Sequence, residues 1–180
     1  MTEDEMVGWH HHLDGHEFEH HTVKSYTMAF SGCTSLKSIG HEAIDCAYVL
    51  NGAVKKNASI ANLFPDCTAL ETVPSDFMIN ADEVTSVYNM FKNCSSLKSF
   101  PVSAFDNLTL LTIVKNLFDG CTSLTGESPY TVVNGVKYHL YERTSDNAVP
   151  SGFKAVTQYE AAFRGCTGLS DYSKIDGTWK

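Results

Sequence analysis

Long apolar runs are missing from this chain of 180 residues, which contains no stretch of eighteen consecutive apolar residues. A membrane-spanning helix needs about twenty such residues, so the sequence predicts no transmembrane segment. Residues 1–21 have neither a basic region nor an apolar stretch, which argues against a secretory signal there. With 43% apolar and 19% charged residues, the chain can still bury a core of about one domain's size.

Clustered positive charge is also lacking. Residues 1–21 hold six acidic residues and no Lys or Arg, whereas residues 22–180 hold fifteen acidic and thirteen basic residues. Nucleic-acid-binding surfaces and polybasic membrane surfaces both require a local excess of Lys and Arg. The sequence therefore predicts no nucleic-acid partner, and evidence for a function has to come from motifs.

Five of the six cysteines share one local frame, with Phe three residues before and Leu three residues after; Cys46 does not fit it. The frames are Phe30-Cys33-Leu36, Phe64-Cys67-Leu70, Phe91-Cys94-Leu97, Phe118-Cys121-Leu124 and Phe163-Cys166-Leu169. The frame cysteines are 34, 27, 27 and 45 residues apart, so the basic period is 27 with insertions of 7 and 18. This recurrence indicates an internal repeat.

Apolar residues within one unit are spaced mostly by three, as in Val84, Val87, Met90, Cys94 and Leu97. This spacing fits neither the helical period of 3.6 nor the strand period of 2, and it favours short strands between tight turns. One unit buries too little apolar surface to fold by itself, so neighbouring units must share a core. The pattern predicts a solenoid whose structural core is made of the Phe, Cys and Leu residues of the five frames.

The extended frame Phe-x-x-Cys-x-x-Leu-x-x-Ile/Val/Phe, twice followed by Pro, resembles the repeats of bacterial surface leucine-rich repeat proteins common in gut Bacteroidetes. The resemblance covers about residues 23–180 and is strongest in residues 126–130, 134–143 and 163–172 and at Trp179, which resemble the terminal unit of those proteins. It implies an α/β leucine-rich-repeat solenoid of about five coils with short parallel strands. It further implies a cell-surface or extracellular, non-catalytic interaction or adhesion module that binds a protein or glycan, without a cofactor.

Residues 1–22 form an acidic, His-rich leader that carries no repeat position, and we expect this leader to be disordered. Residues 2–19 resemble translated copies of a ruminant interspersed repeat, which implies a chimeric reading frame. Members of the surface family normally begin with an export signal, so the resemblance also implies that N-terminal sequence is missing. The chain would then be an inactive fragment of a larger surface protein, which is one alternative function.

The leader contains a second alternative, because His16-Glu17-Phe18-Glu19-His20 fits the H-E-x-x-H motif. In that motif two His one helical turn apart bind zinc and the Glu activates water, so a zinc hydrolase is conceivable. However, six of the first 21 residues are His, which makes a chance match easy, and the extended motif with a third His is absent. We therefore predict no catalytic residue and no metal ligand.

The frame cysteines are expected to be buried thiols. A cysteine nucleophile needs a partnering His, yet His41 and His139 are the only histidines outside the leader, and neither recurs with the frame. Cys fits instead as a small hydrophobic residue between Phe and Leu. Disulfides between neighbouring units remain the alternative.

The 18-residue insertion at residues 130–150 is predicted to contain a β-hairpin, followed by a terminal capping unit at 151–180. Asn134-Gly135 is a favoured two-residue turn between two β-prone runs. We expect Val132, Val136, Tyr138 and Leu140 to compete for a covered face, and Lys137, His139 and Tyr141 to face outward. The hairpin would either cap the last unit or recognise a ligand, with Tyr138, His139 and Tyr141 as candidate interaction residues.

Overall fold

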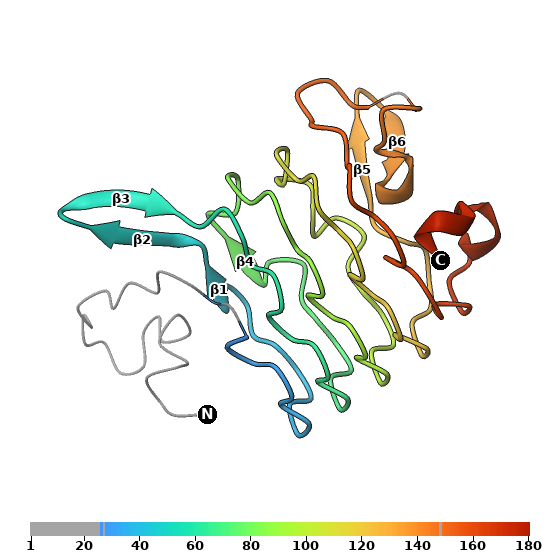
Figure 1. The fold of residues 1–180 in the computed structure, drawn as a ribbon, viewed down its shortest axis with the longest axis horizontal. Helices are drawn as coiled ribbons and strands as arrows, with labels where there is room; N and C mark the ends of the chain where they lie inside the picture. Colours follow the sequence, from blue (N-terminus) through green and yellow to red (C-terminus); the bar gives the residue numbers. More distant parts are fainter. Residues whose placement is uncertain (1–25, 27, 148) are drawn as a thin grey trace.

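Turns dominate the computed structural model, which describes residue 26, residues 28–147 and residues 149–180 (Figure 1). The leader predicted over residues 1–22 lies outside the described residues. The strands pair in twos: β1 (Ile44–Asp45) with β4 (Met78–Ile79) in parallel, β2 (Ala47–Leu50) with β3 (Ala53–Lys56) antiparallel, and β5 (Tyr130–Val133) with β6 (Val136–His139) antiparallel.

Three short 3-10 helices complete the regular structure: η2 (Leu140–Glu142), η3 (Tyr172–Lys174) and η4 (Gly177–Trp179). Each spans three residues. Across the described ranges, no helix has the length and apolar character needed to cross a membrane.

The predicted α/β leucine-rich-repeat solenoid of five coils is wrong. The described part of the chain contains no α-helix, and its sheets are three isolated pairs of strands. Apart from β1 and β4, parallel pairing between neighbouring units is limited to isolated bridges such as Ser59–Ser86 and Ser86–Ile113. The leucine-rich-repeat and solenoid assignments are therefore not supported.

Left-handed backbone at two fixed positions in each unit explains why no longer strand or helix forms. The residue two before the frame Phe has a φ between 54° and 59°, and the residue two after it has a φ between 61° and 82°. A left-handed residue interrupts both helix and strand, so pairing stops after a single bridge. The earlier positions are Met28, Asn62, Asn89, Asn116 and Ala161, and the later ones are Gly32, Asp66, Asn93, Gly120 and Gly165.

Amide side chains at these left-handed positions also join neighbouring units. The Nδ2 group of Asn89 donates to Oδ1 of Asn62 at 2.9 Å, and that of Asn93 donates to Oδ1 of Asp66 at 2.8 Å. Asn and Asp tolerate the left-handed region better than other side chains do, so they suit both tasks. The recurrence of Asn, Asp and Gly around the frame Phe is the sequence signal for these turns.

The repeat units lie side by side (Figure 1). The five frame Phe rings form one stack through the core. Successive ring centroids are 5.1, 5.5, 5.8 and 5.7 Å apart. Thirteen of the fifteen frame residues are buried, and Cys33 and Leu36 in the first unit are half-buried. The apolar core therefore runs from unit to unit through the frame positions.

Backbone and thiol hydrogen bonds follow the same repeat. The N–H group of each frame Phe donates to a carbonyl of the next unit, as from Phe64 to Met90 at 2.9 Å. In the opposite direction, the thiol of a frame cysteine donates to the frame Phe carbonyl of the preceding unit, as from Cys94 to Phe64 at 3.2 Å. The same thiol bond is made by Cys67, Cys121 and Cys166.

Trp179 from η4 covers the last ring of the Phe stack. Its side chain is 2% exposed, its ring lies 6.1 Å from that of Phe163, and it stacks on Tyr159 at 4.6 Å. The Phe163 N–H donates to the Trp179 carbonyl at 2.7 Å, which continues the pattern of bonds between units. The C-terminal residues therefore close the core at this end, within the range 151–180 for which a terminal capping unit was predicted; the hairpin had been considered for the same role.

A second Asn-Gly hairpin lies in the seven-residue insertion of the first interval. Strands β2 and β3 are joined at Asn51-Gly52, and both residues have positive φ, as in the turn at Asn134-Gly135. This hairpin was not predicted from the sequence, although its Asn-Gly signal is the same. Val49 and Val54 on its strands are exposed to solvent.

Candidate functional site

The hairpin of β5 and β6 is present at the predicted turn, but its side chains face differently from expectation. Val132 and Val136 are 56% and 50% exposed, whereas Tyr141 is only 8% exposed. The tip of the hairpin projects beyond the repeat units, so its valines remain uncovered (Figure 1). Strand alternation ends at His139, and the following 3-10 helix η2 turns both Leu140 and Tyr141 inward.

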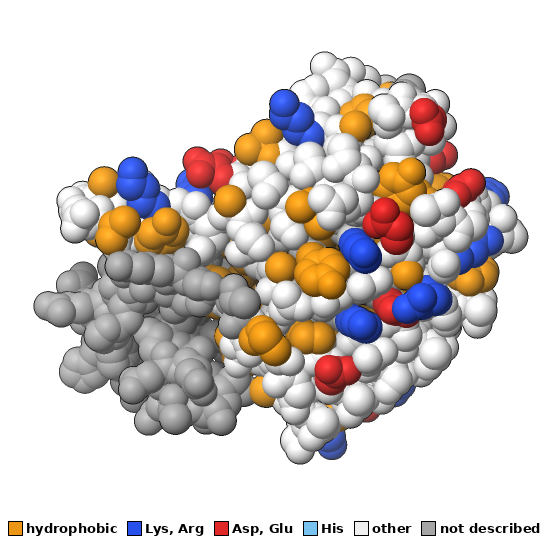
Figure 2. All heavy atoms as spheres, in the orientation of Figure 1, with side chains coloured by type: hydrophobic (Ala, Val, Ile, Leu, Met, Phe, Trp, Pro, Cys, Tyr) orange, Lys and Arg blue, Asp and Glu red, His pale blue; other side chains and the backbone are white. Residues whose placement is uncertain are grey.

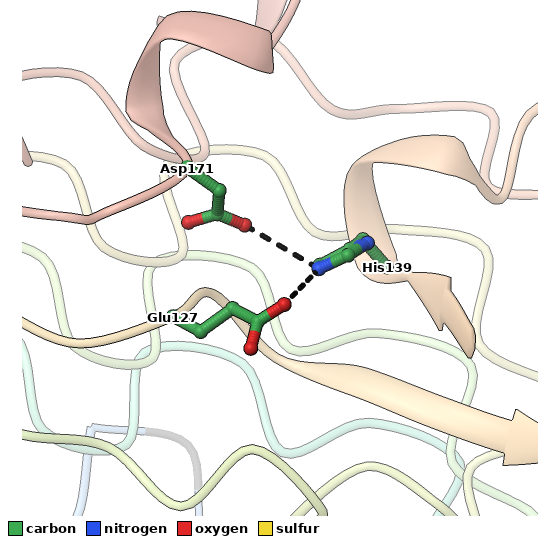
Figure 3. Close-up of side chains that lie close together, drawn as sticks. All are labelled: Glu127, His139 and Asp171. Carbon is green, nitrogen blue, oxygen red and sulfur yellow. Dashed lines mark hydrogen bonds and ion pairs between the residues drawn. The ribbon is translucent and has the colours of Figure 1, made fainter.

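The base of this hairpin brings together Glu127, His139 and Asp171, which we call the carboxylate–histidine cluster (Figure 3). Glu127 precedes β5, His139 ends β6, and Asp171 immediately precedes η3. The Nε2 atom of His139 lies 2.7 Å from Oε1 of Glu127 and 3.6 Å from Oδ2 of Asp171. The side chains of His139 and Asp171 are 13% and 7% exposed and are thus largely shielded from solvent, whereas that of Glu127 is 32% exposed.

Further polar contacts hold the members of the cluster in place. The Nδ1 atom of His139 lies 3.1 Å from Oε2 of Glu142, which also accepts the His139 backbone N–H at 2.9 Å. Asp171 accepts the backbone N–H of Ser128 at 3.0 Å and its hydroxyl at 2.6 Å. The orientations of the His139 ring and of the Asp171 carboxylate are thus set by Glu142 and Ser128.

Aromatic rings enclose His139 on two sides. Its imidazole stacks on Tyr141 with ring centroids 5.0 Å apart and meets Tyr130 edge-on at 5.5 Å. Burial, followed by the negative charge of Asp171 and Glu142, raises the pKa of Tyr141 to about 12. The Tyr141 hydroxyl therefore stays protonated at neutral pH, and the cluster carries no further anion from this ring.

Lys137 supplies the positive charge nearest to Glu127. Its Nζ atom lies 3.1 Å from Oε1 of Glu127 and 4.2 Å from the centre of the Tyr130 ring. Hydrogen bonds from His139 and Lys137 lower the pKa of the Glu127 carboxyl, so this group is ionised at neutral pH. The arrangement can hold a cation between oxygen and nitrogen ligands.

Sequence reasoning found only one member of this cluster. His139 was a candidate interaction residue, but its expected partners were outside the protein, and Glu127 and Asp171 were not considered. These residues are far apart in the chain and meet only because the hairpin folds onto the C-terminal unit. The capping-box pair of His139 and Glu142 was the one local signal that could have been read. Of the other two candidates, Tyr138 is half-buried and Tyr141 is buried.

A second surface feature is a shallow depression across the repeat units, which we call the bridged face. It lies along the bridges that join Ser59, Ser86, Ile113 and Gln158. Its lining residues stand five or three positions before a frame Phe: Ala61, Ser86, Tyr88, Ile113, Lys115 and Gln158. On the side of the molecule shown in Figure 2, hydrophobic side chains lie among Lys, Arg, Asp and Glu.

All six cysteines are thiols in this structure. Desolvation raises the pKa of Cys46, Cys67 and Cys166 to about 12, and it raises the pKa of Cys94 and Cys121 as well. A protonated, fully covered thiol is a poor nucleophile. Cys67, Cys94, Cys121 and Cys166 therefore serve as core residues and as donors to backbone carbonyls.

Native protein is expected to react with a thiol-specific reagent at Cys33 first and at the other five cysteines far more slowly. Cys33 is half-buried, whereas the others are covered and hold their protons. Counting modified residues by mass spectrometry over time checks this, with urea-denatured protein as the control that should react at all six. Fast native modification of Cys94 or Cys121 would contradict their placement in the core.

The H-E-x-x-H motif at His16, Glu17 and His20 lies outside the described residues.

Comparisons of the chain with protein-family models, curated proteins and solved structures found no match. The site therefore has to be interpreted from its own residues.

Proposed function

We propose that this protein is a non-catalytic interaction module of a cell surface that binds an extracellular glycoprotein across the bridged face. The observation that carries the proposal is the continuity of this face. The half-buried position three before the frame Phe recurs from unit to unit, so that Ala61, Tyr88 and Lys115 form a row across neighbouring units. Such a row offers one extended contact surface, because backbone hydrogen bonds join each unit to the next.

Tyr88 is the expected anchor of this surface. Its backbone N–H donates to the Ser86 hydroxyl at 3.3 Å, and its carbonyl accepts the Asn62 N–H at 2.7 Å. The backbone that carries the ring is therefore held on both sides. Half-buried tyrosines lose little conformational freedom on binding and are enriched among the residues that dominate interface energies. Lys115 and Gln158 beside it supply the polar rim typical of protein interfaces.

The surroundings of the nucleophilic and basic side chains support a non-catalytic function. The thiols of Cys67, Cys94, Cys121 and Cys166 donate hydrogen bonds to backbone carbonyls. His41 and His139 each have a carboxylate within hydrogen-bonding distance, which is Asp76 for His41 and Glu127 for His139. In these contacts the thiols and imidazoles serve as hydrogen-bonding groups of the folded structure.

The location at a cell surface is supported by sequence resemblance. Residues 126–130, 134–143 and 163–172 resemble the terminal unit of bacterial surface proteins, and that resemblance implies display and adhesion. An extracellular glycoprotein is a partner that such a surface would meet. Its mixed polar and apolar groups would complement a face on which a tyrosine, a lysine and amide groups lie together.

Replacing Tyr88 with Ala is expected to weaken binding to immobilised extracellular-matrix glycoproteins by about tenfold or more, since truncating an interface anchor costs about 2 kcal/mol. Surface plasmon resonance with the full chain measures this. Tyr48→Ala is the matched control, because Tyr48 is also half-buried but lies on β2. Equal binding by wild type and Tyr88→Ala, or no binding by the wild type, would reject the bridged face as the binding surface.

A further inference from the structure

We propose that Glu127, His139 and Asp171 form a binding site for a divalent transition-metal ion of the zinc type. This proposal does not depend on the function proposed for the bridged face. The three side chains offer one imidazole nitrogen and two carboxylate oxygens, and these three atoms lie within 4.8 Å of one another. Imidazole and carboxylate ligands together are characteristic of zinc sites, whereas calcium and magnesium prefer oxygen alone.

The spacing of the ligand atoms suits a small tetrahedral ion. Zinc lies about 2.0–2.2 Å from nitrogen and oxygen ligands, so two ligand atoms around it are about 3.3 Å apart. The separation between His139 Nε2 and Asp171 Oδ2 is 3.6 Å, which is close to this value. Oε1 of Glu127 lies 2.7 Å from Nε2 and has to move outward, by roughly 0.6 Å for this geometry. The Glu127 side chain is 32% exposed, so it can make that movement.

The residues behind the ligands are those that a zinc site requires. The Nδ1 atom of His139 faces Glu142, and a carboxylate on the far nitrogen of a ligating histidine fixes the tautomer that leaves Nε2 available for the metal. Asp171 is likewise oriented by the N–H and hydroxyl groups of Ser128. Nε2 of His139 points between the Glu127 and Asp171 carboxylates in Figure 3.

The charge balance of the cluster favours a divalent cation. Three carboxylates, those of Glu127, Glu142 and Asp171, surround one imidazole, and Lys137 is the cation beside Glu127. A zinc ion at Nε2 would neutralise two negative charges in a site where His139 and Asp171 are shielded from water. Lys137 would compete with the metal for Glu127, which provides a directional test.

The six leader histidines must be silenced before this site can be measured, because clustered His also binds zinc. The experiment therefore uses the full chain with His10, His11, His12, His16, His20 and His21 replaced by Gln. Isothermal titration calorimetry with zinc chloride gives stoichiometry and affinity. Thermal melts report whether the ion binds the folded state, because a ligand at 100 times its Kd raises the ratio of folded to unfolded protein about 100-fold.

We expect one equivalent of zinc and a higher melting temperature in this background. Glu127→Gln should lower the affinity about tenfold or more without affecting the fold, and Glu142→Gln should lower it about 10- to 100-fold by releasing the imidazole. Lys137→Met should raise the affinity by removing the competing cation. His41→Ala is the control that should change nothing, since His41 forms an exposed pair with Asp76.

Two results would overturn the assignment. One is the absence of stoichiometric binding once the leader histidines are replaced, which would show adventitious binding by the leader only. The other is an unchanged zinc affinity in a folded Glu127→Gln variant, with circular dichroism establishing the fold. A lower affinity in Lys137→Met would also contradict the proposed competition between Lys137 and the metal.

Discussion

Replacing Phe91 with Ala is expected to lower the free energy of unfolding by about 3–5 kcal/mol, the range for truncating a buried Phe. Phe91 is fully buried at the centre of the Phe stack, with ring centroids of Phe64 and Phe118 at 5.5 and 5.8 Å. Phe77 and Phe100 also meet it edge-on, at 5.9 and 5.4 Å. The cavity would open between neighbouring units, where no surface side chain can move in to fill it. Urea unfolding followed by circular dichroism measures the loss.

Two control variants test whether the loss of stability in Phe91→Ala comes from the Phe stack. Phe91→Leu retains much of the apolar volume and should cost distinctly less than Phe91→Ala. Lys98→Ala changes an exposed residue of the same unit whose ion pair with Glu71 is solvent-accessible, so the expected cost is below about 1 kcal/mol. A loss at Phe91 no larger than that at Lys98 would show that the stack does not hold the units together.

Raising the pH from 8 to 10 is expected to destabilise the protein strongly, because the folded state retains thiol protons that the unfolded chain releases. Burial raises the pKa of Cys46, Cys67 and Cys166 to about 12, whereas an unfolded cysteine has a pKa of about 8.5. The stabilisation is thus fully present below about pH 8.5 and is lost as the pH rises toward the folded values. Above about pH 8.5, each thiol that stays protonated in the folded state lowers the free energy of unfolding by about 1.4 kcal/mol per pH unit.

At pH 10 each thiol lowers the free energy of unfolding by about 2 kcal/mol, and the five buried thiols together lower it by on the order of 10 kcal/mol. The raised pKa of Tyr26 acts in the same direction. Urea unfolding at pH 7, 8, 9 and 10 under reducing conditions measures the change. Cys94→Ala should flatten the pH profile by one thiol's share, although cavity formation lowers its stability at pH 7. A free energy of unfolding that stays constant from pH 8 to pH 10 would mean that the thiols titrate equally in both states.

The composition of the shared core could be predicted from the sequence because identical residues recur at identical spacing. Phe64, Cys67 and Leu70 show the same burial as their equivalents in the next unit, as expected for chemically equivalent positions. The hairpin at Asn134-Gly135 was also predictable, because a two-residue turn with two positive φ values depends on the residues of the turn themselves. Both features are determined within a short stretch of chain.

The fold class was not predictable in the same way. Apolar residues spaced by three indicated a chain with frequent tight turns. Whether such turns alternate with helices and extended strands depends on the backbone conformation of single residues. Asn62 and Asp66, on either side of Phe64, adopt left-handed backbone and limit pairing to isolated bridges. The family resemblance therefore led to an α/β solenoid that this structure does not contain.

The sequence by itself determined which residues share the core and where the second insertion turns back. Only the tertiary structure decided that Glu127, His139 and Asp171 meet, that Tyr141 turns inward and that Trp179 covers the end of the stack. The physical reason is the range of the interactions involved. Core composition and turns follow from local chemistry that repeats or acts within a few residues, whereas the cluster requires the hairpin base and the C-terminal unit to pack against each other.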